Sequence, residues 1–148
     1  MSGNPRASYA GDISATEAWR ILRESLQATL IDVRTQAEWA YVGVPLLEGA
    51  GKSPVFIEWQ SYPSMAIAGG FVAQLLDELA KRGVAKSAPL LFICRSGSRS
   101  RSAAIALAAE GYSQCFNVEG GFEGPRNEEG HRGETEGWKA EGLPWVQS

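Results

Sequence analysis

The sequence predicts an α/β fold in which a central parallel sheet of about five strands carries helices on both faces. Short apolar segments rich in β-branched residues alternate along the chain with amphipathic segments of helical periodicity. This alternation favours parallel strands joined by right-handed helical crossovers. The chain has 148 residues, of which 44% are hydrophobic and 21% charged, as in an ordinary globular protein. We therefore expect residues 1–148 to form a single domain.

The first predicted elements are a helix over residues 16–27 and a strand over residues 28–34. Apolar residues of the first segment, with Leu26 at its end, fall on one helical stripe. Ser14 stands where an N-cap is expected, and Glu17 occupies the third helical position. The second segment is short, rich in β-branched residues and followed by charges, which is typical of a buried parallel strand.

The middle of the chain contains one clear helix and one irregular stretch. A short helix is expected over residues 35–43, after which residues 44–70 lose periodicity, although residues 53–59 have the composition of a strand. Apolar residues then recur at helical spacing over residues 71–83. Gly83 is placed to end that helix.

The last third of the chain predicts a strand, a tight turn, a helix and another strand. The strands are expected over residues 88–94 and 114–122, and the helix begins around Ser98 and ends before Gly111. In such sheets ligands bind at the carboxyl ends of the strands, where the turn after residue 94 lies. The predicted core spans about residues 12–122. The tail, residues 123–148, is expected to pack on the body through its aromatic residues, Trp138 and Trp145.

Charge, hydropathy and the counts of cysteine and histidine exclude several classes of function. A net charge of −3 provides no basic field for nucleic acid. No apolar run has the length of a signal peptide or a membrane span, so we expect a cytoplasmic protein. The two cysteines, Cys94 and Cys115, are expected to be reduced. With His131 as the one histidine, neither a zinc site nor a Ser-His-Asp triad is easily assembled, and we expect no metal and no cofactor.

The turn after the strand at residues 88–94 carries the candidate chemistry. Cys94 is expected at the end of a buried strand, and Gly97 permits a backbone angle that directs N–H groups around the sulfur. A helix beginning at Ser98 aims its positive end at the same place, so the loop favours a thiolate. The alternative is a small, inert, buried cysteine, which is the commoner fate of a lone Cys. Arginines at a helix start are electrostatically unfavourable, and a bound anion would explain them. The predicted binding loop is Arg95, Ser96, Gly97, Ser98 and Arg99.

Two segments of the sequence resemble the signature segments of the rhodanese family. CRSGSR, residues 94–99, is similar to the active-site loop of that family, and LIDVRTQAEW, residues 30–39, is similar to its upstream segment. NVEGGF, residues 117–122, follows the loop as it does in rhodaneses. The resemblance covers roughly residues 12–122. The chain lacks the GHI-type sequence that the family often has after its DVR segment.

The resemblance implies a rhodanese-like three-layer fold and a thiosulfate sulfurtransferase activity. Cys94 would take sulfane sulfur from thiosulfate or a similar donor and pass it, as a persulfide, to a thiophilic acceptor such as cyanide or a thiol. The implied partners are a small anionic sulfur donor, a thiol acceptor and, in a relay, a protein that accepts sulfur.

The resemblance also implies roles around Cys94. Backbone N–H groups of residues 95–99 would hold the persulfide, and Arg95 and Arg99 would recruit the anionic donor. Asp32 and Arg34 would brace the loop, although a purely structural role is the simpler interpretation. Glu38 would either pair with an arginine of the loop or remain an exposed helix residue.

Two other functions remain open on the same scaffold. A phosphatase or an arsenate reductase needs a wider ring around a tetrahedral anion, which would require an arginine at the position of Ser100. A non-catalytic module would bind a protein partner or relay sulfur within a larger pathway.

Several other residues are weighed between chemistry and packing. Trp59, Tyr62 and Met65 line the pocket mouth or pack in the core, and packing is the favoured interpretation. Cys115 is expected to be a buried apolar residue, with a resolving thiol as the alternative. His131 is expected at the surface of the tail.

Overall fold

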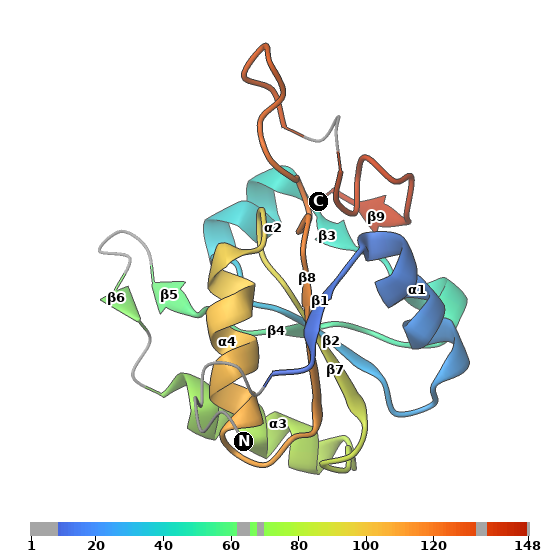
Figure 1. Cartoon of the computed structure of the whole chain (residues 1–148), viewed down its shortest axis with the longest axis vertical. Helices are drawn as coiled ribbons and strands as arrows, with labels where there is room; N and C mark the ends of the chain where they lie inside the picture. Colours follow the sequence, from blue (N-terminus) through green and yellow to red (C-terminus); the bar gives the residue numbers. More distant parts are fainter. Residues whose placement is uncertain (1–8, 62–65, 68–69, 133–135, 148) are drawn as a thin grey trace.

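The computed structural model describes residues 9–61, 66–67, 70–132 and 136–147, which build a parallel sheet flanked by helices (Figure 1). The sheet has five strands in the order β1-β8-β7-β2-β4, and every neighbouring pair is parallel. The strands are β1 (Gly11–Ile13), β2 (Thr29–Asp32), β4 (Val55–Phe56), β7 (Pro89–Ile93) and β8 (Gln114–Val118). The predicted α/β fold is therefore confirmed.

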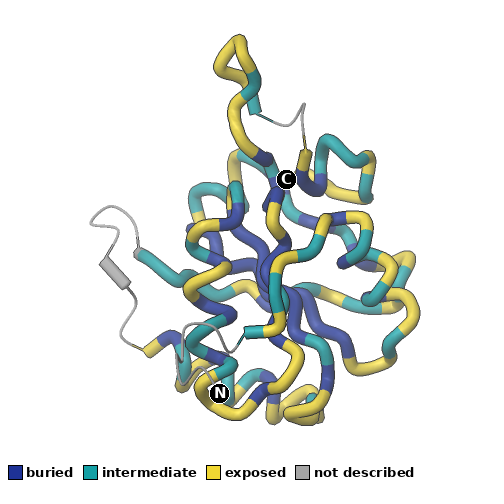
Figure 2. Tube along the Cα trace, viewed as in Figure 1, coloured by how far each residue is buried: buried dark blue, intermediate teal, exposed yellow. Residues whose placement is uncertain are grey.

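Two apolar cores, one on each face of the sheet, show the three layers. Leu90 and Phe92 of β7 face one core, whereas the alternate residues Leu91 and Ile93 face the other, as the two-residue period of a strand requires. Helices α3 and α4 cover the first core, and α1 covers the second together with Trp138 of the tail. The burial pattern follows the sheet through the middle of the molecule (Figure 2). The helices are α1 (Ala15–Glu24), α2 (Gln36–Val42), α3 (Phe71–Lys81) and α4 (Ser98–Ala108).

The first helix begins with the predicted N-cap, but it ends earlier than the sequence predicts. The Ser14 hydroxyl accepts a hydrogen bond from the Glu17 amide, so Ser14 is the N-cap of α1. The helix ends at Glu24 and not at residue 27, because Ser25 adopts an extended conformation. Leu26 is consequently 93% exposed and lies off the helical stripe. Among the described residues, no helix is both long and apolar enough to cross a membrane.

Three short strand pairings were not expected from the sequence. Strand β1 extends the sheet beside β8, and two antiparallel pairs join β3 (Val44–Pro45) to β9 (Trp145–Val146) and β5 (Gln60–Ser61) to β6 (Ala66–Ile67). Strands this short contain too few residues to show a period. The pairing of β3 with β9 places the end of the tail beside the chain that leaves α2.

Candidate active site

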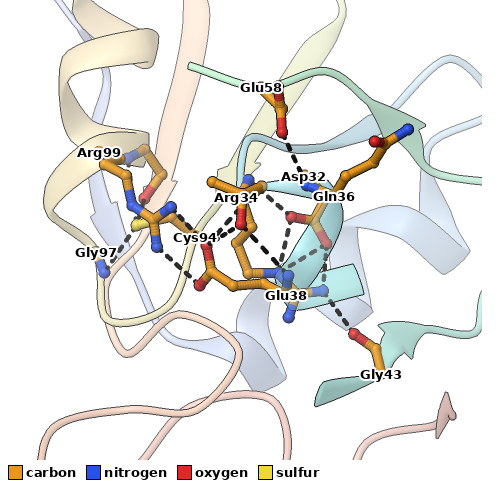
Figure 3. A network of polar contacts seen from close by, with 11 residues as sticks. Asp32, Arg34, Gln36, Glu38, Gly43, Glu58, Cys94, Gly97 and Arg99 are labelled. Atoms are coloured by element: carbon orange, nitrogen blue, oxygen red, sulfur yellow. Dashed lines mark hydrogen bonds and ion pairs between the residues drawn. The ribbon is translucent and has the colours of Figure 1, made fainter. Parts of the chain in front are cut away.

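Cys94 lies at the carboxyl end of β7, in the loop that leads into α4. Its side chain is 1% exposed. Gly97 follows with a φ of 108°, a left-handed conformation in which a side chain would meet the carbonyl of Glu119. The turn brings the first residues of α4 around the sulfur, as the sequence predicts. Figure 3 shows Cys94 with Gly97 and Arg99 beside it.

Two backbone amides and one hydroxyl surround the sulfur, and two of these three groups belong to Ser100, which is not among the predicted loop residues. The amides of Gly97 and Ser100 lie 3.2 and 3.3 Å from Cys94 Sγ, and the Ser100 hydroxyl lies 3.2 Å from it. Ser100 is the third residue of α4, where a backbone N–H has no partner within the helix. The signal that could have found it was the position of its amide in the first turn of a helix that begins at Ser98.

Arg99 points to Glu38 of α2, and the two form a bidentate ion pair. The distances are 2.7 Å from Nη1 to Oε1 and 3.0 Å from Nη2 to Oε2. Burial would raise the pKa of the Glu38 carboxyl, but the hydrogen bonds and charge of Arg99, with further bonds from Thr35, lower it to about 2. Glu38 also closes a capping box with Thr35 at the start of α2. Of the two predicted roles for Glu38, the structure shows pairing with a loop arginine.

Acidic neighbours pair with two of the arginines in this region. Arg99 pairs with Glu38, and Arg101 Nε lies 3.6 Å from Asp12 Oδ1, so a bound anion is not needed to explain either of them. Within the described part of the chain, Arg95 forms no ion pair, and its side chain is exposed. The site therefore leaves Arg95 as its uncompensated positive charge.

Asp32 and Arg34 form a completely buried ion pair at the end of β2. Arg34 Nε lies 2.9 Å from Asp32 Oδ1, and Nη2 lies 2.8 Å from Oδ2 and 2.8 Å from the Gly43 carbonyl (Figure 3). The guanidinium carbon lies 4.3 Å from the centre of the Phe122 ring. The Phe122 amide donates to the Cys94 carbonyl at 2.8 Å. The pair is thus connected to the cysteine loop through Phe122.

The turn at residues 119–124 holds the other side of the loop. The Glu123 and Gly124 amides both donate to the Arg95 carbonyl at 3.0 Å. Gly121 has a φ of 66°, and a Cβ there would lie 2.4 Å from the Arg95 carbonyl oxygen. The predicted strand over residues 114–122 ends earlier, at Val118, because the chain turns directly after it with Gly121 in a left-handed conformation.

A pocket of about 260 Å³ opens above the sulfur. Four predicted loop residues line it, while Gly97 is buried behind the sulfur. Gln60 also lines the pocket, and it was not predicted because its segment has no periodicity. A larger cavity, of about 830 Å³, lies at the amino end of β2 beside Thr29, and therefore at the opposite edge of the sheet. The residues lining the smaller pocket are Glu38, Gln60, Cys94, Arg95, Ser96, Ser98 and Arg99.

The remaining candidates lie away from this pocket. Trp59 packs edge to face on Phe71, with ring centres 4.9 Å apart, which agrees with the packing interpretation. Cys115 is buried on β8, and burial raises the pKa of its thiol to about 12. It pairs with Leu90, four residues before Cys94, which corresponds to about 13 Å along a strand and is too far for a resolving thiol.

The tail residue His131 is exposed, as expected. Tyr62 and Met65 lie outside the described residues. Across the ranges that the structure describes, no three His, Cys, Asp or Glu side chains gather into a possible metal site.

Comparison with known proteins gives a family match over most of the chain. Residues 14–128 match the Rhodanese-like domain. A crystal structure of Rv0390 from M. tuberculosis is similar, with a TM-score of 0.85 and 42% identity, covering 95% of this chain and 100% of that one.

Two relatives from other bacteria match over similar lengths. An uncharacterized protein from Rickettsia conorii is 34% identical over 134 residues, which are 90% of this chain and 95% of that protein. The thiosulfate sulfurtransferase GlpE of Actinobacillus pleuropneumoniae is 27% identical over 135 residues, 90% of each chain.

Proposed function

The chain belongs to the rhodanese-like family, and from this premise we propose that it is a sulfurtransferase that carries sulfane sulfur as a persulfide on Cys94. Sulfur would come from thiosulfate or a similar anionic donor and pass to a thiol or to cyanide. The observation that carries the proposal is the position of Cys94 Sγ. It is held by the Gly97 and Ser100 amides and the Ser100 hydroxyl beneath a pocket of about 260 Å³.

The proposed reaction is a double displacement. The Cys94 thiolate attacks the outer sulfur of thiosulfate, the S–S bond of the donor breaks, and sulfite leaves with the bonding electron pair. The enzyme retains a persulfide with one negative charge. A thiolate or cyanide acceptor then attacks the outer sulfur, and Cys94 leaves as the thiolate. Charge and atoms balance in both steps, and no metal or redox cofactor is required.

The pocket suits a small anionic donor. Arg95 supplies positive charge at the opening, and the α4 N-terminus places its free amides at the base. Arg99 is held by Glu38, so its part is to shape the wall of the pocket more than to bind the donor. The similarity to a protein named as a thiosulfate sulfurtransferase also supports this choice of donor.

Incubation with thiosulfate followed by intact mass measurement tests the proposal. We expect a gain of about 32 Da, one sulfur atom, which a thiol reductant removes. Cys94→Ser should show no gain. Cys115→Ser serves as the matched control and should load normally, because Cys115 lies deep in the core.

Two results would favour the other functions. A protein that gains no mass although it is folded would favour a binding or relay module. Hydrolysis of an aryl phosphate that disappears in Cys94→Ser would favour a phosphatase. The second result is not expected, because position 100 carries a serine whose amide and hydroxyl already contact the sulfur.

A further inference from the structure

A chain of hydrogen bonds leads away from the back of Cys94 and reaches Asp12 near the surface. The Ser100 hydroxyl lies 3.2 Å from Cys94 Sγ and 2.5 Å from Asn117 Oδ1 on β8. The Asn117 amide nitrogen donates to Asp12 Oδ1 at 2.9 Å. Ser100 and Asn117 are both fully buried. The sulfur is therefore connected to the edge strand β1 through two neutral side chains.

The orientation of Asn117 is fixed by Asp12. A carboxylate oxygen can only accept, so the side of Asn117 that faces Asp12 must be its NH2 group. The oxygen of Asn117 then faces Ser100 and can also only accept. The Ser100 hydroxyl has one proton, and at 2.5 Å that proton lies between Ser100 and Asn117.

This assignment leaves a lone pair of Ser100 directed at the sulfur. A Cys94 thiol can donate its own proton to that lone pair, and all groups are then satisfied. A Cys94 thiolate has no proton to donate, so on the side of Ser100 it can only accept a hydrogen bond. If the Ser100 hydroxyl rotates to donate its proton to the thiolate, the buried oxygen of Asn117 loses its hydrogen-bond donor, which is unfavourable.

We propose that Asn117 is a positioning residue that competes with the Cys94 thiolate for the single proton of the Ser100 hydroxyl. The inference rests on the proposed sulfur transfer, because its consequence differs between the states of that cycle. In the persulfide the charge lies on the outer sulfur, in the pocket and away from Ser100. Asn117 then keeps its hydrogen bond, so it favours the sulfur-loaded enzyme over the free thiolate.

The rate of Cys94 alkylation by iodoacetamide at fixed pH tests this competition without any sulfur donor. Asn117→Leu removes the competing acceptor and keeps the branched shape of the side chain, so we expect alkylation about three- to tenfold faster, since a hydrogen bond to a charged sulfur becomes available. Asn117→Val provides a second variant in case the first folds poorly. Peptide mapping separates the two cysteines, and an unreactive Cys115 reports that the core has stayed closed.

The double variant separates competition from simple loosening of the fold. In the Ser100→Ala background no proton is left to compete for, so adding Asn117→Leu should change nothing. Acceleration of the same size in that background, or no acceleration in the single variant, would overturn the proposal.

The sulfur-loaded state gives a second measurement. Sulfite returns the persulfide to thiolate and thiosulfate, and Asn117→Leu should be unloaded at a severalfold lower sulfite concentration. If the parent protein never loads sulfur but the alkylation pattern holds, the proposed function fails while the competition at Ser100 stands. If loading occurs and the sulfite titration is unchanged by Asn117→Leu, the competition has no effect on the cycle and the inference fails.

Discussion

Glu38 determines how much positive charge the pocket presents. Its carboxylate takes both terminal nitrogens of Arg99, although the two residues are 61 positions apart in the sequence. The pair is mostly buried, with side-chain exposures of 14% for Arg99 and 18% for Glu38. Breaking a buried ion pair lowers the stability of the fold more than breaking one on the surface, because the remaining partner stays buried without a counter-charge.

We predict that Glu38→Gln lowers the free energy of unfolding at pH 7 by about 1–3 kcal/mol, the usual worth of a charged hydrogen bond. The pKa of Glu38 is about 2 in the folded protein and 4.5 in the unfolded chain, so the carboxylate stabilises the fold above the second value. That contribution disappears as the pH falls from about 4.5 to about 2. The difference between variant and parent should therefore shrink over this window, as measured by urea unfolding at several pH values.

Asp77→Asn is the matched control for this prediction. Asp77 pairs with Lys81 on α3 at 3.0 Å, but both side chains are more than 60% exposed. Such a pair contributes about 0–1 kcal/mol. If the two substitutions destabilise the protein equally, or if the Glu38→Gln difference persists at pH 2, the pairing with Arg99 is not what stabilises this site.

At the scale of elements, the turn at residues 119–124 and the start of α4 both contact the cysteine loop and hold it in place. We predict that Gly121→Ala destabilises the protein by about 2–4 kcal/mol, as the sum of left-handed strain and steric overlap with the Arg95 carbonyl. The substitution should also slow the loading of Cys94 with sulfur, because the Phe122 amide next to it holds the Cys94 carbonyl. Urea unfolding and the rate of mass gain measure the two effects.

Gly83→Ala isolates the strain from the overlap. Gly83 has a φ of 69° against 66° for Gly121, but a Cβ at Gly83 meets no atom within 4 Å. We expect a loss of about 1 kcal/mol there and unchanged sulfur loading. Equal losses at both glycines would show that the contact with Arg95 does not support the loop.

The elements that could be predicted are those whose own sequence contains the reason for their structure. Ser14 caps the helix that it precedes, and the apolar spacing over residues 71–83 is sufficient to identify α3. The run over residues 88–94 is long and apolar enough to indicate a buried strand, and it places Cys94 at the functional edge. Strands β3 and β9 could not be found in this way, because each depends on a partner about 100 residues away.

The residues of the candidate site also fall into two groups, those that a local sequence signal indicates and those that it does not. The cysteine, the glycine and the helix start are contiguous, so local chemistry indicates them together. Gln60 and Asn117 were missed because their roles depend on distances that only the folded chain sets, whereas the Ser100 amide could have been inferred from its position in the first turn of α4. The sequence also overestimated the free positive charge, since acidic partners from α2 and β1 approach Arg99 and Arg101 only in three dimensions.

At the scale of the whole molecule, the tail lies over the face of the sheet that α1 covers. Trp138 is fully buried there and packs edge to face on Trp19, with ring centres 5.9 Å apart. Its backbone amide donates to the Gly121 carbonyl, and its indole nitrogen donates to the Pro144 carbonyl at 2.6 Å. Lys139 Nζ lies 5.3 Å from the ring centre of Phe122 and 4.0 Å from that of Trp145, and the two rings contact each other edge to face. The tail thus contacts the turn that supports the cysteine loop.

These contacts lead us to propose that tail and body unfold as one cooperative unit. Trp138→Ala should cost about 3–5 kcal/mol, the usual loss for a large buried aromatic side chain, which lowers the melting temperature by about 10 °C in a chain of this length. Trp138→Phe keeps part of the contact and should fall between the variant and the parent. Leu26→Ala, at a residue that is 93% exposed, should change the melting temperature very little.

Calorimetry distinguishes cooperative unfolding from separate unfolding of the tail. A single transition that moves to lower temperature as a whole means that the tail stabilises the core. A main transition that stays in place, with only a small early transition altered, would mean that residues 123–148 are an accessory segment. The first outcome is expected, because the Trp138 side chain is part of the core beneath α1 while the backbone amide of the same residue donates to the Gly121 carbonyl, so the core and the turn are joined at this residue.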